Sequence, residues 1–112
     1  MIDARQFNVC DGEGKLLCPT CGFPAYVDGE AYDEAGGMPG SGICPCCLWE
    51  PGFDDDPAAS AAAQGTILAS LQSYRASWRL TMEWRVASCK PDAWDGEQQL
   101  ARLLAIAPHL RG

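Results

Sequence analysis

The fold of this chain is decided by two short stretches, Cys18-Pro19-Thr20-Cys21 and Cys44-Pro45-Cys46-Cys47. In each stretch two residues separate a pair of thiols, a proline follows the first thiol, and 22 residues lie between the stretches. Such spacing is typical of two metal knuckles that close one four-thiolate site, because both sulfurs of a knuckle can then reach one ion at about 2.3 Å. The pattern predicts one structural Zn²⁺ ion bound by Cys18, Cys21, Cys44 and Cys47.

Two other uses of these thiols remain open from the sequence. Iron is the first, because a rubredoxin-like electron-transfer centre also uses two such knuckles. The aromatic and glycine pattern of a rubredoxin centre is missing between Cys21 and Cys44. A redox-active dithiol formed by Cys44 and Cys47 is the second, although no βαβ pattern surrounds this pair. Zinc is therefore the favoured metal and iron the alternative.

The residues that a catalytic site needs are missing from the sequence. A catalytic zinc keeps one coordination position open and commonly uses His or carboxylate ligands. The chain has one histidine, His109, close to its last residue, and we expect its side chain to be exposed to solvent. No Ser-His-Asp set, phosphate loop or nucleotide-binding motif is present. The sequence predicts a protein that is not an enzyme.

The charge of the chain bears on its partners. The chain has eight Lys and Arg residues and fifteen Asp and Glu residues, which gives a formal net charge of −7. Four thiolates and one divalent ion would change this charge to about −9. A protein this acidic is repelled by phosphate backbones, so a nucleic-acid-associated zinc ribbon is the weaker alternative and another protein is the expected partner. Six basic residues lie in the second half and are expected on a solvated surface: Arg75, Arg79, Arg85, Lys90, Arg102 and Arg111.

The cysteine count indicates the compartment. Seven cysteines are an odd number, the first residues lack an apolar signal core, and no apolar run approaches the length of a membrane span. We therefore expect reduced thiols in the cytoplasm and no membrane segment. Cys46 cannot easily share an ion with both Cys44 and Cys47. Cys10 and Cys89 lack partners at metal spacing, and we expect them to be buried thiols.

The chain divides into three segments within one domain of residues 1–112. Residues 1–56 hold the zinc-ribbon part, residues 57–65 form an Ala-rich connector, and residues 66–112 are helical. Residues 28–42 are rich in glycine and acid, and they predict a long hairpin loop between the strands of the ribbon. The run Asp54-Asp55-Asp56 predicts a solvated turn before a helix, with Asp56 as N-cap and Pro57 as the first helical residue.

Two helices are predicted in the last segment. The first begins with Thr66 as N-cap and carries an apolar stripe on one side, with Gln72, Ser73, Arg75 and Arg79 on the solvent side. The stripe consists of Ile67, Leu68, Leu71, Tyr74 and Trp78. The second helix follows Asp95, which pairs with Gln98 as in a capping box, and ends before Pro108. Its buried face consists of Leu100, Leu103, Leu104 and Ala107.

The stretch between the helices allows two interpretations. Apolar residues alternate with polar ones over residues 80–86, which favours an extended segment, and a first helix that continues to about Arg85 is the alternative. The tryptophans Trp49, Trp78, Trp84 and Trp94 are expected in the core or against the knuckles. The predicted fold class is a small α+β protein, in which a four-Cys zinc ribbon with β-hairpin knuckles packs on one or two C-terminal α-helices.

Three stretches resemble the bacterial cysteine-rich CPCC family. These are residues 18–23 (CPTCGF), residues 42–50 (GICPCCLWE) and residues 54–57 (DDDP), followed by a helix rich in Leu, Ala and Tyr. The resemblance covers about residues 16–80, and the second stretch with Ile43, Trp49 and Glu50 is its specific part. In the first stretch Thr20 stands where the family often has cysteine. The resemblance implies a small, soluble, zinc-ribbon-like protein and implies no biochemical activity.

Overall fold

The computed structural model describes residues 3–112 and has an α+β fold, as predicted. Two α-helices lie in the second half of the chain, and one short antiparallel hairpin lies near the start. Their bounds are β1 Val9–Cys10, β2 Leu16–Leu17, α1 Ile67–Arg79 and α2 Gly96–Ile106. Three short 3-10 helices complete the described elements: η1 Ala4–Phe7, η2 Ala87–Cys89 and η3 Pro108–Leu110.

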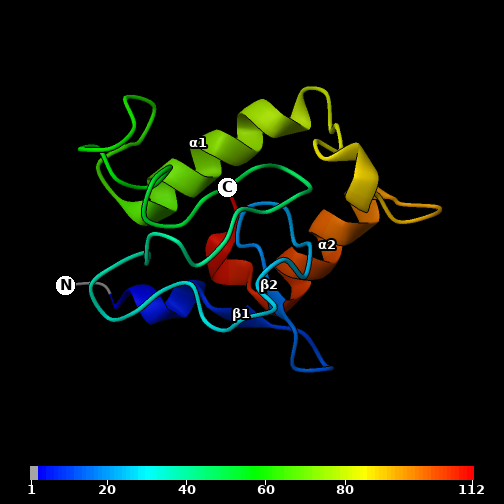
Figure 1. The fold of residues 1–112 in the computed structure, drawn as a ribbon, viewed down its shortest axis with the longest axis horizontal. Helices are drawn as coiled ribbons and strands as arrows, with labels where there is room; N and C mark the ends of the chain where they lie inside the picture. Colours follow the sequence, from blue (N-terminus) through cyan, green and yellow to red (C-terminus); the bar gives the residue numbers. More distant parts are fainter. Residues whose placement is uncertain (1–2) are drawn as a thin grey trace.

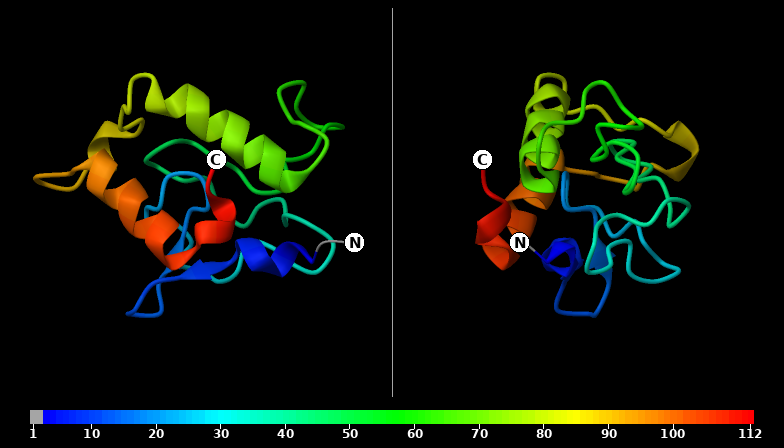
Figure 2. Two further views of the ribbon diagram at one scale, coloured as in Figure 1. Left: turned by 180° about the vertical axis from the view of Figure 1, so that it is seen from behind. Right: turned by 90° about the vertical axis from the view of Figure 1, so that its left-hand side faces the viewer.

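The elements form two layers. Helices α1 and α2 lie on one side of the molecule, and the long irregular segment of residues 18–56 lies on the other, as the edge-on view in Figure 2 shows. The hairpin β1–β2 lies below α2, and the two helices cross at an angle rather than running side by side (Figure 1). Buried residues of both layers belong to one core, which includes five of the cysteines, Trp49 and Leu103. Each layer thus covers the other.

Helix α1 begins as predicted. The Thr66 hydroxyl accepts a hydrogen bond from the backbone N of Ala69 at 3.0 Å, which satisfies one of the free N–H groups of the first turn. Leu71 and Trp78 are buried, and Ile67, Leu68 and Tyr74 pack against the core as partly buried residues. The predicted apolar stripe is therefore the face that α1 turns toward the irregular layer.

Helix α2 also has the predicted cap. The Asp95 carboxylate accepts from the backbone N of Gln98 at 3.1 Å. Leu100, Leu103 and Ala107 of the predicted face are buried, and Leu104 is partly buried. The helix ends at Ile106, and Pro108 begins η3. A proline cannot continue the hydrogen-bonding pattern of a helix, so it fixes this end.

Residues 80–86 are neither a strand nor part of α1, so both expectations for this segment are wrong. The chain turns after Arg79, and Met82 has a left-handed backbone with φ of 49°. The backbone N atoms of Arg85 and Val86 then donate to the carbonyls of Cys46 and Pro45, each at 3.0 Å. The alternation in the sequence reflects contact with the second knuckle, because Trp84 is buried while its neighbours in sequence are exposed.

The ribbon predicted around the knuckles is present only in part. Strand β2 leads directly into Cys18, but its partner is β1, which precedes it. Among the described residues, the predicted loop 28–42 contains one isolated bridge, between Tyr32 and Gly37, and no strand leads into the second knuckle. The hairpin β1–β2 was not predicted, because each strand has two residues and leaves no readable alternation.

The connector and the acidic run form turns rather than a helix. The carboxylates of Asp54, Asp55 and Asp56 each accept from a nearby backbone N–H, those of Glu50, Gly52 and Ala58 respectively. Asp55 is buried, so the expectation of a fully solvated turn is wrong for this residue. Asp56 caps one turn that no helix continues, because α1 begins at Ile67. Within residues 3–112, every helix is too short and too polar to cross a membrane.

Candidate metal centre

The structure brings together the four thiols that the spacing selected. The sulfur atoms of Cys18, Cys21, Cys44 and Cys47 all lie within 4.8 Å of one another. The Sγ atoms of Cys18 and Cys47 are 3.7 Å apart, and those of Cys21 and Cys44 are 3.6 Å apart. A regular tetrahedron of sulfurs about 2.3 Å from a zinc ion has edges of about 3.8 Å. The sulfur–sulfur separations are therefore compatible with one tetrahedral ion.

The two knuckles have the same backbone hydrogen bonds. In the first, Gly22 N donates to Cys18 O at 2.9 Å and Cys18 N donates to the carbonyl of Phe23 at 2.7 Å. In the second, Leu48 N donates to Cys44 O at 2.7 Å and Cys44 N donates to the carbonyl of Trp49 at 3.0 Å. The close sulfur pairs each join one knuckle to the other, so the site exists only when both knuckles are docked.

The residue after each knuckle has a left-handed backbone. Gly22 has φ of 92°, a conformation that glycine adopts without steric cost. Leu48 has φ of 68°, although leucine rarely adopts this conformation. The second knuckle therefore keeps the same turn as the first, and leucine carries the backbone strain.

Because of this strain, we expect glycine at position 48 to give a more stable protein than alanine, the reverse of the usual order. Both Leu48→Ala and Leu48→Gly remove the partly buried side chain, but only glycine removes the left-handed penalty of about 1–2 kcal/mol. We expect Leu48→Gly to be more stable than Leu48→Ala by about 1 kcal/mol, measured by urea unfolding of the metal-loaded protein. Alanine more stable than glycine, the usual order, would contradict the assigned backbone.

Helix α1 holds the knuckles through two side chains. The Tyr74 hydroxyl donates to the carbonyl of Cys47 at 2.8 Å. The Arg75 guanidinium is fully buried and donates to the carbonyls of Pro19, Thr20 and Leu110, each at 2.7 Å. The prediction that Arg75 lies on a solvated surface is wrong. A signal was available, because position 75 lies four residues after Leu71 and three before Trp78 and so shares their face.

Helix α2 holds the knuckles through Gln99. Its side-chain amide donates to the carbonyl of Cys21 at 3.0 Å and approaches the Cys46 sulfur at 3.5 Å. Its carbonyl oxygen accepts from the Trp94 indole at 3.0 Å, which fixes the orientation of the amide. Gln99 was not among the predicted site residues, although it lies four residues before Leu103 and so shares the buried face of α2. Cys46 is buried beside the four-thiol group and is outside it.

The electrostatics of the four-thiol group favour a bound cation. Burial raises the pKa of the Cys21 and Cys47 thiols well above their ordinary value. Burial also works against ionisation of Cys18, but hydrogen bonds from the Cys21, Cys44 and Cys47 thiols together hold the pKa of Cys18 well below its ordinary value. Four thiolates cannot coexist in this interior without a positive ion, and thiolates are the form that binds zinc. The donor chemistry fits a divalent metal.

The remaining cysteines and the histidine lie away from this group. Cys10 and Cys89 are exposed, so the prediction that they are buried is wrong. His109 is exposed, as expected, and a nitrogen of its ring lies 3.1 Å from the carbonyl of Gln6. Within residues 3–112, the four-thiol group is the only set of three or more His, Cys, Asp or Glu side chains close enough to share an ion.

Comparison of the chain with known proteins identifies no related protein. No protein-family model matches the chain, and no curated protein or solved structure is significantly similar to it. The resemblance to the CPCC family is therefore not supported by a family match. The buried four-cysteine group is the part of that resemblance which stands.

Proposed function

We propose that this protein binds one structural zinc ion through Cys18, Cys21, Cys44 and Cys47 and acts as a non-enzymatic protein-interaction module. The observation that carries the proposal is the closure of the site. All four cysteines are at most 1% exposed, and helices α1 and α2 hold the knuckles from the side of the helical layer. A closed four-sulfur site leaves no coordination position for a substrate. Its role is then to stabilise a segment that has few strands or helices of its own.

Iron remains the alternative occupant, because four thiolates bind either metal. The two metals differ in colour as well as in chemistry. An iron tetrathiolate makes the protein red through thiolate-to-iron absorption, whereas zinc gives no visible colour. We expect a colourless preparation from cells that are supplied with iron. A red preparation would contradict the interaction module and indicate an electron-transfer protein.

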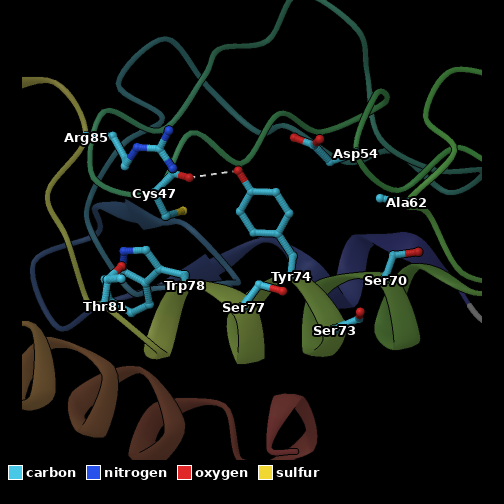
Figure 3. Close-up of a pocket in the computed structure, with 10 residues that line it drawn as sticks. All are labelled: Cys47, Asp54, Ala62, Ser70, Ser73, Tyr74, Ser77, Trp78, Thr81 and Arg85. Atoms are coloured by element: carbon cyan, nitrogen blue, oxygen red, sulfur yellow. Dashed lines mark hydrogen bonds between the residues drawn. The ribbon is translucent and has the colours of Figure 1, made fainter.

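A cavity beside the second knuckle supports the interaction role. It has a volume of about 340 Å³ and lies between α1 and the knuckle backbone. Figure 3 shows Arg85 at one end, Asp54 at the other, and Tyr74 between them with its hydroxyl on the carbonyl of Cys47. Hydroxyl groups of α1, including that of Ser77, line the wall below. A partner that enters this cavity would contact the loop whose shape the metal maintains.

Blocking the cavity tests this role. Ser77 is exposed and lines the cavity, so Ser77→Trp is expected to fill it without disturbing the core. Ala76→Trp is the matched control, because Ala76 is exposed on α1 and is outside the cavity lining. In affinity capture from native lysate, the wild-type protein and the control are expected to recover the same partner. Ser77→Trp is expected to recover at least about tenfold less of it, which corresponds to a loss of about 1.4 kcal/mol in binding free energy. Repeated recovery of no specific protein would contradict the interaction module.

A further inference from the structure

Arg75 carries a buried charge that has no carboxylate partner. Its residue exposure is 0%, and its three side-chain hydrogen bonds all end on backbone carbonyls. The ion pairs among residues 3–112 are Arg5 with Asp3 and Lys15 with Glu13, and Arg75 belongs to neither. A buried cation is costly unless an anion lies close by, because carbonyl dipoles replace only part of its hydration.

The metal site can supply the missing anion. Four thiolates around one divalent ion carry a net charge of −2. Two of the carbonyls that Arg75 binds belong to Pro19 and Thr20, the residues between Cys18 and Cys21, so the guanidinium lies against the first knuckle itself. Burial lowers the pKa of Arg75, and the charges of Cys18, Cys21 and Cys47 oppose this shift only in part. A metal tetrathiolate of net charge −2 beside the guanidinium would offset part of the cost of burying this cation.

We propose that Arg75 is the buried counter-cation of the metal tetrathiolate, so that metal binding and burial of this arginine stabilise each other. The proposal rests on the metal site proposed above. Coupling between two sites is reciprocal, so loss of the charge weakens metal binding by the same factor by which loss of the metal weakens burial of the arginine. Arg75 also donates to the carbonyl of Leu110, so docking of η3 at the end of the chain is coupled to the metal.

The test separates charge from hydrogen bonding. Arg75→Lys keeps the charge and loses the planar fork, whereas Arg75→Gln loses the charge and keeps an amide donor. Arg79→Gln is the control, because Arg79 is exposed at the end of α1. Zinc affinity is measured by competition with a chelator on each full-length protein, together with urea unfolding of the zinc-loaded form.

We expect the zinc affinity of Arg75→Gln to be at least about tenfold lower than that of Arg75→Lys, since opposite charges interact more strongly in a protein interior than in water. Arg79→Gln should bind as the wild type does. Equal affinities for Arg75→Lys and Arg75→Gln would overturn the counter-cation and leave Arg75 as a clamp on the knuckle. Failure of Arg75→Gln alone to fold with zinc, while Arg75→Lys folds and binds, agrees with the proposal. A wild-type protein that binds no metal would overturn the metal site itself.

Discussion

Replacement of Cys44 by serine is expected to unfold this protein. Residues 18–56 contain no α-helix and, apart from one isolated bridge between Tyr32 and Gly37, no strand pairing. The proposed metal ion would therefore supply the stabilisation that such elements provide in other domains. Apparent binding free energies of structural zinc sites are about 10–16 kcal/mol, which is as large as the whole free energy of unfolding of a typical domain. We expect Cys44→Ser to lose the native tryptophan fluorescence of Trp49 and the near-UV circular dichroism signal.

Two other cysteines provide matched controls for Cys44→Ser. Cys89 is exposed, and Cys89→Ser is expected to unfold at the same urea concentration as the wild type. Cys46 is buried beside the four-thiol group, and Cys46→Ser is expected to keep a full metal complement while losing about 1–2 kcal/mol from the free energy of unfolding. A folded, metal-loaded Cys44→Ser would contradict the assignment, and so would loss of the metal from Cys46→Ser.

The second large effect is expected from Gly22→Ala. Gly22 has φ of 92°, and a Cβ atom there would lie 2.8 Å from the backbone oxygen of Gln99 and 2.9 Å from Cβ of Leu103. The left-handed backbone costs about 1–2 kcal/mol in alanine, and overpacking costs about 1–3 kcal/mol more. We expect a loss of about 3 kcal/mol from the free energy of unfolding, since the first knuckle must move away from α2.

Gly12→Ala is the control for this change. Nothing lies within 4 Å of a Cβ atom built on Gly12, and its φ is outside the left-handed region. Urea unfolding of both variants in the zinc-loaded form is the measurement, and Gly12→Ala is expected to stay within about 0.5 kcal/mol of the wild type. An equal, small effect of the two substitutions would show that α2 does not press on the first knuckle.

The features that could be predicted from sequence are those with local rules. The spacing of the cysteines selected the four thiols, and cap residues such as Thr66 and Asp95 located the starts of both helices. Each of these depends on residues close in the sequence, whose geometry varies little from one protein to another.

The features that could not be predicted depend on contacts between distant residues. The position of Arg75 on the apolar face of α1 is readable from the sequence, but its hydrogen-bond partners are not, because the carbonyls of the first knuckle lie 55 and 56 residues away. The alternation over residues 80–86 imitates a strand, but its cause is contact of Trp84 and the backbone with the second knuckle. Expecting ribbon strands around both knuckles overlooked that the metal can order a loop without them.

Metal content per chain tests the central claim most directly. Elemental mass spectrometry on untagged protein, purified from cells supplied with both zinc and iron, measures the identity and the stoichiometry of the bound metal together. One zinc ion per chain is the predicted result, because the geometry has one closed site for one tetrahedral ion. A folded protein that contains no metal would contradict the account.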